Sequence, residues 1–198
     1  MNTKIKHIVL KTENLTIGYQ QKKSRTVIAK NVNLSLEKGK FIALLGKNGI
    51  GKSTLLRTIS KVQNPLLGSV FINNKNLNQY SNKELATNLS LVLTERLPES
   101  QLTVFELIAL GRQPYTNWVD KISDHDLDKI NWAIEKTEIR HLQEKRFYEL
   151  SDGQLQRVLI ARALAQDTEI IILDEPTAHL DMHHTYKIFQ LLKKLVET

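Results

Sequence analysis

The chain has 198 residues, of which 41% are hydrophobic and 25% charged, and its formal net charge is +7. These values suit one compact domain with a buried core and a charged surface. No apolar run approaches the roughly 20 residues of a membrane-spanning helix, and the first residues lack the pattern of a signal peptide, so we expect neither a span nor export. There is no cysteine, which excludes disulfides, thiolate metal sites and a cysteine nucleophile.

The positive charge suits an anionic ligand, an anionic membrane surface or a nucleic acid. The densest group of basic residues is Lys22, Lys23 and Arg25, in a segment that we predict to be a turn. Because the other basic residues are scattered, a solvated surface is the simplest interpretation. Charge alone does not choose a partner.

Apolar runs alternate with helical patterns along the chain, which favours an α/β domain. Residues 15–19 and 27–36 flank a polar stretch and are predicted to form antiparallel strands. Residues 41–45 (FIALL) form a continuous apolar run, typical of a strand that is buried on both faces. A glycine-rich turn and a predicted helix over 52–59 follow this run.

Further elements follow in chain order. A short strand is predicted over 70–72, and Thr103 with Glu106 forms a capping box that opens a helix through Leu110. Helical spacing predicts two more amphipathic helices. The first is marked by Leu127, Ile130, Trp132 and Ile134. The second ends the chain with an apolar face made of Tyr186, Phe189, Leu192 and Val196.

Residues 46–54 (GKNGIGKST) fit the pattern G-x-x-x-x-G-K-[ST], in which glycines let backbone N–H groups wrap phosphates at a helix N-terminus. Lys52 is expected to neutralise the outer phosphates and Ser53 to hold Mg²⁺. The alternative is a glycine turn with a purely structural role, but the position after FIALL favours a phosphate site. The candidate nucleotide-binding residues are Gly46, Lys47, Asn48, Gly49, Ile50, Gly51, Lys52, Ser53 and Thr54.

A second apolar run, residues 170–173 (IIIL), predicts another buried strand, and two carboxylates follow it directly. We expect Asp174 to hold Mg²⁺ through water and Glu175 to polarise the water that attacks the terminal phosphate. Acidic residues also cap strand ends for structural reasons, so the pair alone is weak evidence. The phosphate-loop pattern upstream favours the catalytic interpretation.

Residues 150–157 (LSDGQLQR) precede an alanine-rich helix through Ala165, and they resemble the ABC signature motif. The usual form has glycine where this chain has Asp152. Ser151, Gly153 and Gln154 remain at a helix N-terminus, which attracts anions. In the family this motif completes the ATP pocket of the opposite subunit. Without the other motifs, Ser151 would read as an ordinary helix N-cap.

The resemblance to ABC transporter ATP-binding subunits covers essentially the whole chain. It implies a P-loop NTPase of the ABC ATPase type, with an N-terminal antiparallel β subdomain, a RecA-like core and a helical subdomain. One domain over 1–198 is expected, with the core in about 1–90 and 160–198 and the helical subdomain in about 95–160. Tyr19 stands where the family stacks an aromatic ring on adenine, although a core tyrosine is an alternative. Asp181 lies in the place of the D-loop, which links the two ATP sites of a dimer.

Residues 103–115 (TVFELIALGRQPY) are similar to a segment of the ATPases that import iron–siderophores, haem and vitamin B12. The resemblance implies an ATPase that uses ATP and Mg²⁺ to energise such an importer. The implied partners are a second copy of the chain around two ATP, a polytopic permease and, indirectly, a substrate-binding protein. It also implies a cytoplasmic location on the inner face of the membrane, and no nucleic acid partner is expected.

Two departures from the family pattern stand out. Thr94, followed by the charged Glu95, occupies the place of a glutamine that touches Mg²⁺, so Thr94 becomes the candidate metal contact there. The family also has a further strand that ends in a switch histidine, whereas His183 and His184 lie too close to the D-loop for that role. We therefore expect a C-terminally truncated domain, in which turnover is an open question.

Two alternative functions remain from the sequence. One is an ABC-type ATPase that acts on nucleic acid or ribosomes, to which the basic charge lends slight support. Such proteins usually carry two nucleotide domains or a long coiled-coil insertion, and this chain shows neither. The other is a nucleotide-binding regulator with little turnover, which the missing switch histidine and Thr94 suggest.

Overall fold

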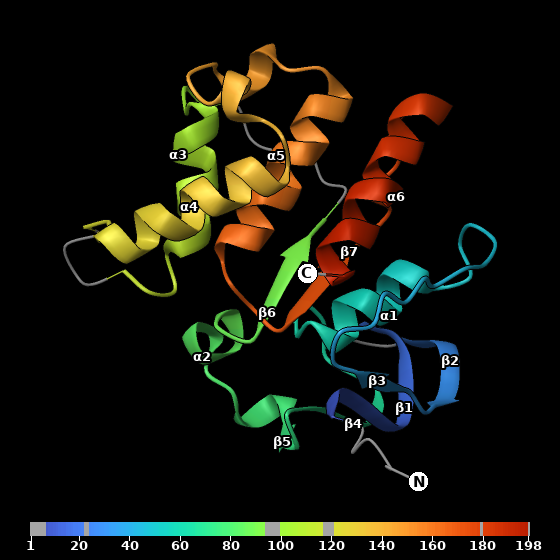
Figure 1. The fold of residues 1–198 in the computed structure, drawn as a ribbon. Helices are drawn as coiled ribbons and strands as arrows, with labels where there is room; N and C mark the ends of the chain where they lie inside the picture. Colours follow the sequence, from blue (N-terminus) through green and yellow to red (C-terminus); the bar gives the residue numbers. More distant parts are fainter. Residues whose placement is uncertain (1–6, 22–23, 94–99, 117–120, 179, 198) are drawn as a thin grey trace, which may run out of the picture. The chain divides into compact units, whose positions relative to one another are not determined.

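A computed structural model describes residues 7–21, 24–93, 100–116, 121–178 and 180–197 (Figure 1). The chain divides into two compact units, Met1–Asn82 and Lys83–Thr198. Among the described residues, no helix combines the length and the apolar character that crossing a membrane requires.

The first unit is built on a five-stranded sheet. Its strands are β1 (Ile8–Gln21), β2 (Ser24–Val32), β3 (Ser35–Glu37), β4 (Leu67–Ile72) and β5 (Lys75–Asn76). The order is β2-β1-β4-β5, β3 also pairs with β1, and every pairing is antiparallel. Leu15 and Ile17 of the long strand β1 are buried. The helix α1 (Lys52–Ile59) contacts β1, and a short 3-10 helix spans Leu77–Gln79.

The predicted hairpin at the start of the chain is confirmed, since Gly18 of β1 pairs with Val27 of β2. The single strand predicted over 27–36 is instead two strands, β2 and β3, which break at Asn33 and Leu34. The backbone N–H of Leu34 donates to the Thr12 hydroxyl at 2.9 Å, so it is bonded to a side chain instead of a strand ladder. The interruption therefore coincides with a side-chain hydrogen bond that takes the place of a ladder hydrogen bond.

The strand predicted over 41–45 is wrong, because no β ladder of the described chain includes these residues. Their exposed fractions are 49% for Phe41, 54% for Ile42, 43% for Leu44 and 87% for Leu45. An apolar run is compatible with a strand, but a strand forms only where neighbours satisfy its backbone N–H and C=O groups. The hydrophobicity of residues 41–45 therefore does not by itself determine whether they pair with another strand.

The second unit combines a two-stranded sheet with helices. Strands β6 (Leu89–Val92) and β7 (Ile170–Leu173) pair in parallel, so the predicted strand over 170–173 is confirmed. Its complete burial is not, because Ile171 is 38% exposed. The helices are α2 (Asn82–Ala86, which begins at the unit boundary), α3 (Val104–Ala109), α4 (Asp124–Lys136), α5 (Asp152–Ala165) and α6 (Met182–Glu197). Three short 3-10 helices are η2 (Leu110–Arg112), η3 (Arg140–Leu142) and η4 (Phe147–Glu149).

The core of this unit lies where α3, α4 and α5 pack together, with α6 against them. Ile108 of α3, Ile134 of α4 and Val158 of α5 are completely buried. The predicted capping box of Thr103 and Glu106 is present at the start of α3, which passes into the 3-10 helix η2 at Leu110. Each of these helices therefore contributes one apolar face to a single core.

Two of the predicted apolar faces differ from the faces that are buried in the structure. In α4, Leu127 and Trp132 are 36% and 40% exposed. In α6, Tyr186, Phe189 and Val196 are 61%, 46% and 39% exposed, and the buried residues are Ile188, Leu191 and Leu192. Residues 188, 191, 192 and 195 also have helical spacing, and this alternative stripe packs on the core. Periodicity alone could not decide between two overlapping stripes.

Candidate functional site

The predicted phosphate loop, residues 46–51, has no regular structure and leads into α1, which begins at Lys52 as predicted. Gly49 and Gly51 have φ angles of 78° and 107°, in the left-handed region that favours glycine. A Cβ atom at Gly51 would lie 2.3 Å from Cγ2 of Ile28. The glycine is therefore required both by the backbone turn and by the close approach of β2.

The Lys52 ammonium folds back over this loop. Its Nζ donates to the carbonyl oxygens of Gly46 at 3.0 Å and Lys47 at 3.1 Å. Residues 46–50 are all exposed, including Lys47 and Asn48. Because phosphate oxygens accept hydrogen bonds from an ammonium more strongly than neutral carbonyls do, an incoming phosphate can replace these acceptors. The loop thus holds a cation at an open helix N-terminus.

Tyr19 of β1 lies beside the first turn of α1. Its hydroxyl oxygen is 3.0 Å from Oγ1 of Thr54, and Thr54 is buried while Tyr19 is 49% exposed. The tyrosine is therefore hydrogen-bonded to the phosphate-loop helix and remains half-exposed. Ser53, the candidate Mg²⁺ contact, is partly buried in the same turn.

The two predicted carboxylates follow β7 and have different surroundings. Asp174 is only 5% exposed, and its backbone N–H donates to the Val92 carbonyl of β6 at 2.9 Å. Glu175 is exposed and has a φ of 48°, which is uncommon for a residue other than glycine. Its carbonyl accepts from the Ala178 N–H at 3.0 Å. The chain therefore turns at Glu175, so that one carboxylate is enclosed and the next faces solvent.

Ser151 is the N-cap of α5 and forms a reciprocal capping box with Gln154. The Ser151 hydroxyl accepts from the Gln154 N–H at 3.4 Å, and the Gln154 side-chain oxygen accepts from the Ser151 N–H at 3.1 Å. Gly153 is buried, and a Cβ there would lie 2.7 Å from Cδ2 of His184. Asp152 is exposed at the first helical position. The N-cap role is thus present in the structure, at a 14-residue helix whose positive end suits an anion.

Asp181 lies directly before α6. Its carboxylate accepts from the His184 backbone N–H at 2.8 Å and lies 2.9 Å from His184 Nδ1. These hydrogen bonds from His184, the backbone one first, lower the pKa of Asp181 below its ordinary value. His183 and His184 are exposed in the first turn of α6, as expected for surface residues.

Thr94 and Glu95, at the position of the family's metal-contacting glutamine, lie outside the described residues. So do Lys22 and Lys23, and Arg25 belongs to β2. No group of three or more metal-binding side chains occurs among the residues that the structure describes. The Ser53 hydroxyl and the Asp174 carboxylate supply oxygen donors, the ligand type that Mg²⁺ prefers, so their chemistry fits that ion.

The comparisons with known proteins agree with these features. The ABC transporter family matches residues 29–178. Over 94% of this chain, it is 41% identical to the iron(3+)-hydroxamate import ATP-binding protein FhuC of Bacillus subtilis, of which it covers 68%. It is 37% identical, over 94% of its length, to the ferric enterobactin transport ATP-binding protein FepC of Escherichia coli, of which it covers 67%. The chain belongs to the ABC transporter family.

A solved structure shows the same fold. The ATP-binding cassette of an ABC transporter, solved as a dimer with ADP and phosphate, superposes with a TM-score of 0.79 and 33% identity, covering 95% of this chain and 83% of that one. The expected P-loop fold of the ABC ATPase type is therefore confirmed, and so is the resemblance to iron–siderophore importer subunits. The chain spans between 64% and 73% of the length of eight curated relatives that it matches, FhuC and FepC among them.

Proposed function

We propose that this chain is the ATP-binding and ATP-hydrolysing subunit of an ABC importer, for cargo of the iron–siderophore, haem or cobalamin type. The observation that carries the proposal is the phosphate loop, in which two left-handed glycines lead into α1 and present the Lys52 ammonium. Identities of 41% and 37% to importer subunits support the cargo class.

Each site residue has a role that its own surroundings allow. The backbone N–H groups of residues 46–51 and the Lys52 ammonium bind the phosphates. Ser53 and Asp174 would hold Mg²⁺, which supplies positive charge to the phosphate oxygens when it is bound. Glu175 is exposed and accepts a proton from the attacking water. Tyr19, which is half-exposed, stacks on the base.

The proposed partner at the nucleotide is a second copy of the chain. Ser151, Gly153 and Gln154 of one copy bind the phosphates held by residues 46–54 of the other, while Asp181 links the two sites. The dimeric relative with bound ADP supports this arrangement. Because phosphate charge is neutralised from both sides only in the closed dimer, ATP binding favours closure and hydrolysis favours opening. The difference in ATP affinity between the closed and the open dimer would drive conformational change in a permease at the inner face of the membrane.

The test uses Glu175→Gln, which keeps the shape of the side chain and removes its proton acceptor. We expect the variant to bind ATP as the parent does, to lose hydrolysis and to accumulate an ATP-bound dimer in size-exclusion chromatography. If it hydrolyses ATP at the parent's rate, Glu175 is not the base. If the parent shows no magnesium-dependent ATPase activity, alone or with a permease, the proposed function fails.

The rival functions are separated by what stimulates turnover. Stimulation of the ATPase rate by a detergent-solubilised permease supports the importer. Stimulation only by DNA, RNA or ribosomes would replace it with a nucleic-acid function. ATP binding without turnover under all of these conditions would indicate a nucleotide-binding regulator.

A further inference from the structure

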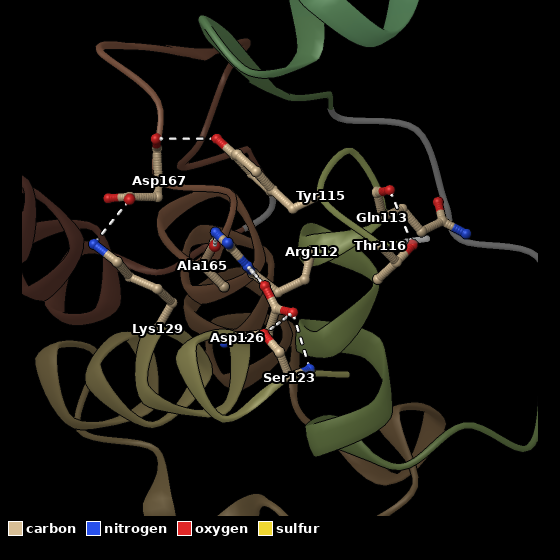
Figure 2. A network of polar contacts seen from close by, with 9 residues as sticks. All are labelled: Arg112, Gln113, Tyr115, Thr116, Ser123, Asp126, Lys129, Ala165 and Asp167. Atoms are coloured by element: carbon tan, nitrogen blue, oxygen red, sulfur yellow. Dashed lines mark hydrogen bonds and ion pairs between the residues drawn. The ribbon is translucent and has the colours of Figure 1, made fainter. Parts of the chain in front are cut away.

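A buried ion pair joins the helices of the second unit. Arg112 of η2 and Asp126 of α4 are 2% and 5% exposed, and Nε of Arg112 donates to Oδ1 of Asp126 at 2.8 Å. Figure 2 shows the pair at the centre of a network that includes Ser123. The other oxygen of Asp126 accepts from the Ser123 N–H at 3.0 Å and from its hydroxyl at 2.6 Å. Both charges are therefore satisfied away from water, as buried charges must be.

The same arginine caps the C-terminal end of α5. Nη1 of Arg112 donates to the Ala165 carbonyl at 2.8 Å, one of the last carbonyls of α5, which have no partner within the helix. A cation at this end is also favoured by the helix dipole. Arg112 thus ties η2, the start of α4 and the end of α5 together through one side chain.

Further contacts hold the turn that follows α5. The Tyr115 ring lies 4.0 Å from the Arg112 guanidinium carbon, and its hydroxyl donates to the Asp167 carbonyl at 3.4 Å. Nζ of Lys129 lies 2.8 Å from the Asp167 carboxylate. Figure 2 shows these residues around Asp167, beside the arginine. The turn that leads to β7 is therefore held by the same cluster.

Gly111 allows this cluster to form. A Cβ at Gly111 would lie 2.3 Å from the Arg162 carbonyl oxygen in α5. Only a residue without a side chain lets η2 approach α5 closely enough for Arg112 to reach Ala165. The two adjacent residues therefore act together: Gly111 allows η2 to approach α5, and Arg112 makes the polar contacts.

We propose that Arg112 is a positioning residue for ATP hydrolysis, because it fixes the C-terminal end of the helix that carries the signature residues. The inference rests on the proposed function. Ser151, Gly153 and Gln154 stand at the other end of α5, whose 14 residues span about 21 Å. A tilt of about 10° at the fixed end would move them by about 4 Å. Asp174 and Glu175 follow the turn that the same cluster holds.

The structural part of the proposal is tested by hydrogen exchange on the whole protein without nucleotide. We compare the parent with Arg112→Met, with Gly111→Ala, and with Arg140→Met as a matched control, since Arg140 forms an exposed ion pair with Glu135. Exchange of the amides over residues 164–170 should accelerate at least 10-fold in the first two variants and stay unchanged in the control. Unchanged exchange in Arg112→Met would show that Arg112 does not hold the end of α5, and would overturn the structural part of the proposal. If Arg112→Met does not fold, Asp126→Asn, which removes the charge that Arg112 pairs with, takes its place.

The catalytic part is tested by steady-state kinetics and ATP binding. Although Asp174 follows the turn that the cluster holds, most of the proposed phosphate contacts belong to the other unit, so the Kd of MgATP for one chain should change far less than kcat in Arg112→Met and Gly111→Ala. We expect kcat to fall about 100-fold, the loss typical of a small misplacement of a reacting group, and Arg112→Lys to recover part of it. ATP-driven dimers should also disappear when Arg112→Met is added to Glu175→Gln.

Parent-like kcat in a folded Arg112→Met, or equal losses of kcat and ATP affinity, would overturn the positioning role. If the parent itself does not hydrolyse ATP, the proposed function fails, and the hydrogen-exchange comparison still decides whether Arg112 holds α5 and its turn.

Discussion

The phosphate loop and the helical cluster of the second unit use their polar groups in opposite ways. Lys52 is bonded to two carbonyl oxygens of an exposed loop, which a ligand can replace. Arg112 is bonded to a carboxylate and a helix carbonyl that are buried in the interior. The first arrangement favours binding and the second favours fixed geometry. Substitutions in the two regions should therefore separate ATP affinity from stability.

The largest loss of stability is expected when Arg112 is replaced. Its replacement by methionine leaves Asp126 buried without its cation, which typically costs about 3–5 kcal/mol. We expect the free energy of unfolding, measured in urea, to fall by about that amount, while the folded fraction binds MgATP with an affinity close to the parent's. A loss below about 1 kcal/mol would contradict the assigned burial of the pair.

Replacing Lys52 by alanine should have the opposite pattern. Charge-assisted hydrogen bonds contribute about 1.5–3 kcal/mol, so MgATP affinity should fall about 10- to 100-fold. The urea midpoint should stay at the parent value, because the lysine is bonded to carbonyls of an exposed loop. Calorimetry and denaturation on the same preparation check both outcomes.

The pH dependence of stability sharpens the comparison. Burial raises the pKa of Asp126, but hydrogen bonds from Ser123 and Arg112, together with the Arg112 charge, lower it from 3.8 to about 2. Because the pKa of Asp126 is lower in the folded state, its ionised carboxylate stabilises the fold by about 2 kcal/mol. This stabilisation is complete above about pH 4 and is lost as the pH falls toward 2. Asp126→Asn should remove this part of the acid dependence, as urea titrations between pH 5 and 2 would show.

A smaller effect is expected at the start of α3. The hydroxyl of Thr103 accepts from the Glu106 N–H, and the Glu106 carboxylate accepts from the Thr103 N–H, which lowers the pKa of Glu106. Loss of an N-cap hydroxyl costs about 1 kcal/mol. Thr103→Ala should therefore shift the urea midpoint slightly, without changing ATP affinity. Thr103→Ser, which keeps the hydroxyl, is the matched control.

The smallest effect is expected at the exposed pair of Arg140 and Glu135, whose side chains are 55% and 65% exposed. Exposed ion pairs contribute about 0–1 kcal/mol. Arg140→Met should therefore leave both the free energy of unfolding and the ATP affinity close to the parent's values. A loss as large as that of Arg112→Met would mean that burial is not what distinguishes the two pairs.

The sequence predicted those features that depend on local patterns. The strand over 170–173, the helix that begins at Lys52 and the capping box at Thr103 all follow from runs, glycines and caps within a few residues. Gly49 and Gly51 have the backbone conformations that a phosphate loop needs. Such features need no knowledge of distant contacts.

The remaining features depend on partners far along the chain. Residues 41–45 have the hydrophobicity of a strand, but pairing requires a neighbour that the run itself does not encode. The buried stripe of α6 is chosen by the core that it meets, not by Tyr186 or Phe189. Arg112 and Asp126 are 14 residues apart, and each looks like a surface charge in the sequence. The glycine before Arg112 was the available signal, because it permits a close helix approach.

The account depends on a nucleotide-binding loop that works through Lys52, and calorimetry of the purified protein with ATP tests it most directly. We predict saturable binding that requires magnesium and that weakens at least 10-fold in Lys52→Ala. Absence of magnesium-dependent binding in the parent, or equal affinity in the two proteins, would contradict the account.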